Sequence, residues 1–179
     1  MRDGIDRDGF IFPIAPFYSP KNLPEIYLGL PPFNSPADAE ERAGGAWQTP
    51  LENKYFRLAQ EILRNLDEAP WREGMRLKRI DVSSAFSGSA GQREIVIYTE
   101  EEVIIRENER EIVCIFPKIL RLPVKDYPQQ LGNFLTLRRT MLEDYQRQLA
   151  KSHFTQSPVQ FAPRMIDLRI PQLAFVQNN

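Results

Sequence analysis

Residues 75–122 decide the fold, and they read MRLKRIDVSSAFSGSAGQREIVIYTEEEVIIRENEREIVCIFPKILRL. Apolar and polar side chains alternate here, as in half-buried strands, and turn residues recur at intervals of about ten residues. The pattern predicts a strand over 75–86, a turn at SGSAG and a returning strand over 93–100. Further short strands are expected at 102–107, 110–116 and 119–123, with a polar turn at ENE. Short strands joined in this way form an antiparallel meander.

A first amphipathic helix is predicted before the meander, over residues 50–67. Thr49 is a candidate N-cap, Pro50 suits the first helical position, and Glu52 completes a capping box. One helical face is apolar, which suits a helix that lies on a sheet. This apolar face consists of Tyr55, Leu58, Ala59, Ile62, Leu63 and Leu66.

A second amphipathic helix is predicted after the meander, starting at Asp126 as the cap with Pro128 in its first turn. Its apolar face runs from Tyr127 to Leu149, and Arg138 is among the residues expected to face away from the core. The order of elements predicts an α+β fold, in which a mostly antiparallel sheet packs against two amphipathic helices. We expect residues 1–179 to form a single domain.

The N-terminal quarter contains many prolines and reads as extended or irregular chain. The segment DGIDRDG carries two Asp-Gly turn signals, and a short strand over 9–12 ends at Pro13. A second extended piece covers residues 25–30. Residues 33–50 read as a long surface loop.

The last segment, residues 164–179, reads RMIDLRIPQLAFVQNN. Ile166, Leu168 and Ile170 fall on one side of an extended chain, after which Pro171 interrupts and a second apolar run follows. Proline has no N–H for a ladder, so this pattern is typical of a sheet edge, where another chain can add a strand.

The composition excludes several classes of protein. A net charge of −1 argues against a nucleic-acid partner, and the sequence lacks both a signal peptide and an apolar run long enough to cross a bilayer. We therefore expect the chain as given to be soluble. Cys114 is the only cysteine, which excludes an intramolecular disulfide, and its apolar setting predicts a packed, inert thiol.

Candidate chemistry is sparse. His153 is the only histidine, so no His or Cys cluster is available to bind a metal, and DGIDRDG lacks the spacing of a calcium loop. SGSAGQ has no phosphate-binding lysine, and Ser84, Ser87 and Ser89 lack a nucleophile motif. The run 99–102 (TEEE) is placed at a hairpin turn, as a solvated charge cluster or an acidic docking spot. We expect no enzymatic activity, no metal and no cofactor.

Several stretches, in order, resemble the β-domain of the bacterial cell-division family FtsQ (DivIB in Gram-positive bacteria). GIDRDGFIFPI resembles the family's D-x-x-G-x-x-F opening, and LPEIYLG its LP-x-h-x-G segment, where h is apolar. LRLPVKDYPQQLGNFLTL is similar to its strand-to-helix run, and RMIDLRIPQLAFV to its hxYVDLRYxxGhAV signature. The resemblance covers residues 4–177, without the family's POTRA domain and membrane helix.

The resemblance implies a non-enzymatic scaffold. Proteins of this family are anchored in the inner membrane by a single helix and place the β-domain on the periplasmic, extracytoplasmic side. They recruit the coiled-coil partners FtsB and FtsL to the septum and support peptidoglycan synthesis. The last strand of the domain receives FtsB by strand addition. Carried onto this sequence, the partner-binding residues are Arg169, Ile170, Leu173, Ala174, Phe175 and Val176.

The sequence also departs from the family pattern. Ile170 stands where the family often has tyrosine, Leu173 where glycine is frequent, and Asn133 where it has an arginine. The basic pair expected near Ser83 is missing, so the ion pairs with a partner are expected to differ. Two alternatives remain open: a hydrolase that uses a serine of SSAFSGS, and a lipid-carrier or interaction domain unrelated to division, with a deep apolar groove.

Overall fold

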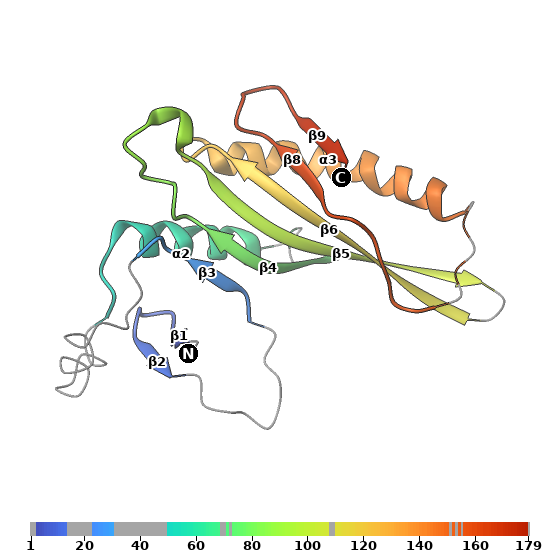
Figure 1. Ribbon diagram of the computed structural model, residues 1–179, viewed down its shortest axis with the longest axis horizontal. Coiled ribbons are helices and arrows are strands. Elements are labelled where there is room, and N and C mark those ends of the chain that lie inside the picture. Colours follow the sequence, from blue (N-terminus) through green and yellow to red (C-terminus); the bar gives the residue numbers. More distant parts are fainter. Residues whose placement is uncertain are drawn as a thin grey trace.

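The computed structural model describes residues 3–13, 23–30, 50–68, 71, 73–107, 110–150, 152, 154 and 156–178 (Figure 1). The predicted α+β class is confirmed: a multi-stranded sheet packs against two helices. Thr49, His153 and most of the loop predicted at 33–50 lie outside the described residues. The elements are β1 Asp3–Ile5, β2 Ile11–Pro13, β3 Glu25–Tyr27, α2 Lys54–Asp67, β4 Met75–Asp81, a 3-10 turn Ala90–Gln92, β5 Ile95–Glu107, β6 Arg110–Leu122, α3 Tyr127–Leu149, β7 Val159–Gln160, β8 Arg164–Asp167 and β9 Phe175–Asn178.

The main sheet is mixed, with the strand order β3-β4-β5-β6-β8-β9 and β7 beside β6. The pairs β4–β5, β5–β6 and β8–β9 are antiparallel. β3 runs parallel to β4, and both β7 and β8 run parallel to β6. These parallel pairs join segments far apart in the sequence, and α3 provides the crossover from β6 to β8. β1 and β2 form a separate antiparallel pair.

The centre of the sheet is one long hairpin, in place of the four short strands predicted for residues 93–123. β5 and β6 have 13 residues each and pair without interruption from Ile95 opposite Leu122 to Glu107 opposite Arg110. The strand breaks predicted at 101 and at 117–118 are wrong, and residues 108–109 of the turn predicted at ENE lie outside the described residues. Pro117 is tolerated inside β6 opposite Glu100.

One face of the sheet forms the core. In β6 every second residue from Ile112 to Leu122 is buried, and the residues between them are only partly covered. The helices α2 and α3 pack on the buried face, and both lie behind the sheet in Figure 1. Cys114 belongs to this row and is fully buried, which confirms the predicted packed thiol, and burial raises its pKa.

The helix α2 begins later than predicted. Its N-cap is Asn53, whose side-chain oxygen accepts the N–H of Phe56 at 2.8 Å, so Pro50 and Glu52 precede the helix. Phe56, which the predicted apolar face omitted, is buried with Leu58, Ala59, Ile62 and Leu66. The capping box predicted over 49–52 therefore does not form the start of the helix.

The helix α3 starts at the predicted residue but by a different mechanism. Asp126 precedes it in the left-handed conformation (φ 60°), and its side chain makes no capping hydrogen bond. Tyr127, Leu131, Phe134, Met141, Tyr145 and Leu149 are buried as expected, together with Gln130.

The acidic run 99–102 lies inside β5, so its predicted place at a hairpin turn is wrong. Each glutamate has a basic partner on a neighbouring element: Glu100 with Lys78 at 3.3 Å, and Glu102 with Arg76 at 3.7 Å. Glu101 is buried on the helix-facing side and binds both Lys118 and Arg138. The run is therefore neutralised by β4, β6 and α3.

Arg138 consequently points into the protein, contrary to its predicted outward position. Its Nε donates to Glu101 at 2.8 Å, and one terminal nitrogen donates to the carbonyl of Glu73 at 3.1 Å. Burial lowers the pKa of the Lys118 ammonium, and the attraction of Glu101 opposes this change. The contacts of Glu101 with Arg138 and Lys118 thus fix α3 against the two central strands, β5 and β6.

Of the two Asp-Gly turn signals in DGIDRDG, the one at Asp8-Gly9 is confirmed, whereas Asp3-Gly4 lies in the strand β1, so that turn prediction is wrong. The Asp6 carboxylate accepts the N–H groups of Asp8 at 2.9 Å and Phe10 at 2.8 Å, while Gly9 takes a positive φ of 95°. The side chain of Asp6 thus serves the local backbone, as an Asx turn does.

Candidate docking site at the C-terminal strand

The strand β8 is anchored in the core. Ile166 and Leu168 are buried, and the N–H of Leu168 donates to the carbonyl of Arg121 at 2.8 Å. The predicted alternation stops before Ile170, because β8 ends at Asp167, so Ile170 leaves the row of Ile166 and Leu168 and is 51% exposed.

Pro171 lies in the turn between β8 and β9. Gln172 follows with a positive φ of 63°, and the N–H of Leu173 donates to the carbonyl of Ile170 at 3.2 Å. Because the proline is outside both strands, its missing N–H removes no ladder hydrogen bond. The chain therefore reverses here and adds β9 antiparallel to β8.

The outer side of β9 is an edge of the sheet, with no neighbouring strand among the described residues. Leu168 turns its backbone polar groups toward β6, so those of Asp167 and Met165 turn toward β9. Phe175 and Gln177, which lie opposite these two residues, complete the inner ladder. Val176 then presents its N–H and C=O groups at the outer edge.

Apolar side chains accompany this edge. Leu173 is 53% exposed and Phe175 58%, and Ala174 is exposed between them. Phe175 shares its face with Asp167, whereas Val176 lies opposite Ile166 on the helix-facing side and is 43% exposed. A visiting strand would therefore meet one apolar side chain on each face.

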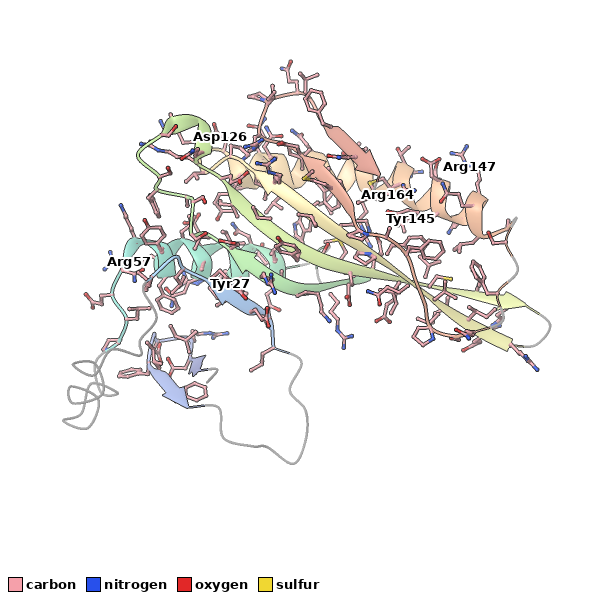
Figure 2. The ribbon with its side chains drawn as sticks, in the orientation of Figure 1. Tyr27, Arg57, Asp126, Tyr145, Arg147 and Arg164 are labelled. Atoms are coloured by element: carbon pink, nitrogen blue, oxygen red, sulfur yellow. The ribbon has the colours of Figure 1, made fainter. Side chains whose placement is uncertain are left out.

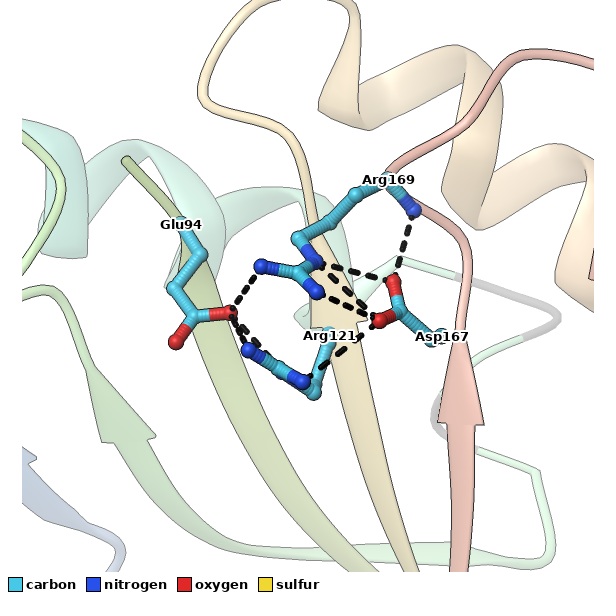
Figure 3. A network of polar contacts seen from close by, with 4 residues as sticks. All are labelled: Glu94, Arg121, Asp167 and Arg169. Atoms are coloured by element: carbon cyan, nitrogen blue, oxygen red, sulfur yellow. Dashed lines mark hydrogen bonds and ion pairs between the residues drawn. The ribbon is translucent and has the colours of Figure 1, made fainter. Parts of the chain in front are cut away.

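Four charged residues fix the start of the β8–β9 connection (Figure 3). Arg169 binds both carboxylate oxygens of Asp167, at 2.9 Å from Nε and 2.7 Å from a terminal nitrogen. Arg121 lies 2.7 Å from Glu94 and 3.5 Å from Asp167, and Arg169 also lies 3.2 Å from Glu94. The two arginines and two carboxylates thus join β6, β8 and the residue before β5.

The electrostatics of this network favour its ionised form. Burial would raise the pKa of the Asp167 carboxyl, but hydrogen bonds from Arg169 and the charge of Arg121 outweigh burial and hold the pKa below its usual value. The Asp167 carboxyl is therefore ionised at neutral pH.

The structure places the six predicted partner-binding residues in two groups. Ile170, Leu173, Ala174, Phe175 and Val176 are exposed along the turn and β9. Arg169 is separate, because its guanidinium is engaged by Asp167 and Glu94. The sequence analysis did not identify Glu94 and Arg121, which are brought to this site only by sheet pairing and carry no local motif.

The serine-rich turn between β4 and β5, residues 82–94, is closed by its own hydrogen bonds. Ser87 Oγ donates to Gln92 Oε1 at 3.2 Å, and the N–H of Ser87 donates to the carbonyl of Ser84. The Ser83 hydroxyl donates to Asp81 at 2.6 Å. These contacts close the turn between β4 and β5.

A cavity of about 460 Å³ lies among β1, β3, α2 and the start of β4. Its wall combines apolar residues such as Ile26 and Phe56 with charged residues such as Arg7, Arg64 and Asp67. Eight of the thirteen lining residues are apolar, as the lipid-carrier alternative expects of its groove, and five are polar or charged.

Among the described residues, no group of three or more His, Cys, Asp or Glu side chains is placed to hold a metal ion. Within the same part of the chain, neither helix is both long and apolar enough to cross a membrane.

Comparison with protein-family models, with curated proteins and with solved structures gives no match to this chain.

Proposed function

We propose that this chain is a non-enzymatic scaffold domain of the bacterial division machinery, similar to the β-domain of FtsQ, and that it binds a coiled-coil partner of the FtsB/FtsL kind by strand addition at β9. One observation carries the proposal: β9 is an edge strand whose outer backbone groups are open among the described residues and whose Leu173, Phe175 and Val176 are exposed. Strand addition to such an edge is a common mode of peptide recognition.

The energetics explain why the exposed apolar residues matter. Backbone hydrogen bonds contribute about 0.5–1.5 kcal/mol each, and a strand as short as β9 offers few of them. Association and ordering of a free peptide cost several kcal/mol. The visiting strand must therefore also bury apolar side chains, and Leu173 and Phe175 are placed to receive them.

The resemblance also supports a proposed location. In the full-length protein, this domain would lie on the periplasmic side of the inner membrane, anchored by one helix that is not part of this chain. The proposed role is to bring the partner to the septum, where peptidoglycan is made.

The test is a pull-down with the FtsB/FtsL-like pair from the same bacterium. Phe175→Lys and Leu173→Glu are expected to abolish capture, because each puts a charge where an apolar contact forms. Ile104→Lys is the matched control, since Ile104 is 60% exposed near the hairpin end of β5, opposite Val113 and away from β9. All three variants should keep melting temperatures within a few degrees of the wild type. Capture that survives both β9 substitutions would show that the partner binds elsewhere.

A further inference from the structure

Arg164 begins β8 and is half-buried beneath α3. In the sheet it lies between Lys118 of β6 and Asn178 of β9. Its guanidinium carbon is 4.7 Å from the centroid of the Tyr145 ring, a cation–π distance, so α3 holds the arginine in place. Figure 2 shows Arg164 and Tyr145 near each other, between β8 and α3.

Positive charge exceeds negative charge around this arginine. Glu101 is the buried carboxylate of this region, and it already binds Lys118 and Arg138. Among the described residues, no carboxylate lies within ion-pair distance of Arg164. After burial, which is the largest cause, Arg138 and Arg164 both contribute to the lowered pKa of Lys118. Two of the three cations thus share Glu101, and a second carboxylate beside Arg164 would relieve the repulsion.

The open edge brings a visiting chain within reach. Neighbouring strands lie about 4.8 Å apart, so a strand added outside β9 would run about 10 Å from β8. A visiting residue opposite Asn178 would share the helix-facing side with Arg164, because residues paired across strands point to the same face. An arginine and a glutamate are both long enough to meet across this gap, whereas an aspartate is shorter. Guanidinium groups bind carboxylates with a matching planar geometry.

We infer that the strand which docks on β9 carries a glutamate on its helix-facing side, and that this glutamate forms an ion pair with Arg164. The inference rests on the proposed function of β9. It adds that the docking strand must be acidic at one position, which the apolar edge alone does not require. Arg164 would act as a specificity residue, selecting acidic strands from others of similar apolar pattern.

The experiment is a selection from a displayed library of random peptides of about ten residues, using the full chain as the target. Wild type is compared with Arg164→Gln, Arg164→Glu and the matched control Arg139→Gln, whose arginine is exposed on α3 and pairs with Glu143. A fifth target, Phe175→Lys, marks peptides whose binding depends on β9. Melting temperatures confirm that every target is folded.

We expect the β9-dependent peptides selected by wild type to share a glutamate at one fixed position. Arg164→Gln should bind these peptides about tenfold less tightly, as expected for loss of a charge-assisted hydrogen bond. Arg164→Glu should instead select lysine or arginine at that position, and Arg139→Gln should behave as wild type. Peptides that depend on Phe175 but show no acidic preference would overturn the inference and leave the docking edge intact. Peptides that bind Phe175→Lys as well as wild type would count against the docking edge itself.

Discussion

Phe175 lies directly opposite Asp167 in the β8–β9 pair, so the exposed aromatic ring of β9 shares a face with the charged network that holds the connection. Asp167 binds Arg169 and contacts Arg121, and the second contact ties β8, the neighbour of the edge strand, to β6. The four charged residues thus hold β8, and with it β9, in place, although the unpaired backbone groups of the edge belong to β9.

Hydrogen exchange should reveal the two sides of β9. The N–H of Gln177 is directed at β8, whereas that of Val176 is directed at the outer edge, so in the free chain Val176 should exchange at least about tenfold faster. Residue-resolved exchange by NMR measures this ratio. Equal protection of both amides would mean that the outer edge is already paired, which would remove the basis for strand addition.

Asp167→Asn should lower the free energy of unfolding by about 1–2 kcal/mol at neutral pH, because two arginines lose a charged partner. The folded-state pKa of Asp167 is below its unfolded value of about 3.9, so its contribution is complete above that pH and is lost as the pH falls through the folded pKa. Urea denaturation of both proteins should show a constant difference between pH 5 and pH 8 that shrinks in strong acid. A difference that instead grows below pH 4 would contradict this assignment.

The buried charges predict an asymmetry between two substitutions. Glu101→Gln leaves Lys118 and Arg138 without their carboxylate and should cost about 3–5 kcal/mol of stability. Lys118→Met should cost clearly less, because Glu101 keeps Arg138 and because burial already disfavours the charged lysine. Chemical denaturation at pH 7 gives both values. If Lys118→Met were the more damaging change, the lysine would be the main partner of the carboxylate.

Gly29 follows β3 with a positive φ of 68°, and a Cβ at this position would lie 2.8 Å from Ser83. Gly29→Ala should therefore destabilise the protein by about 1–3 kcal/mol through backbone strain and the close contact. Gly88 is the matched control, since a Cβ there meets nothing within 4 Å. Thermal unfolding should separate the two variants by several degrees. Similar melting temperatures would mean that the chain can shift at Gly29 without cost.

Patterns within short stretches of sequence predicted the strand regions and the two helices. The alternation of residues 75–122 gave the strand regions, and the apolar faces gave both helices close to their observed positions. Asn53, in place of Thr49, caps α2 by accepting the N–H of Phe56, whose side chain is buried in the first turn of the helix. Local reasoning can propose caps but cannot choose one when tertiary packing makes the choice.

The errors in the sheet have a common physical cause. Glu101 looked like a turn residue because glutamate is rarely buried, yet Lys118 and Arg138, 17 and 37 residues away, make its burial possible. The parallel pairs of β3 with β4 and of β8 with β6 depend equally on distant segments. Likewise, the apolar residues of the candidate site were visible in the last segment, but Glu94 and Arg121 were not, since only the folded sheet brings them to Asp167.

Among the described residues β9 pairs with β8 alone, and β8 pairs with β6 across the α3 crossover, so the edge exists only when these distant segments have come together. A partner that recognises this edge would therefore bind the folded domain and pass over chains in which α3 has not yet brought β8 to the sheet.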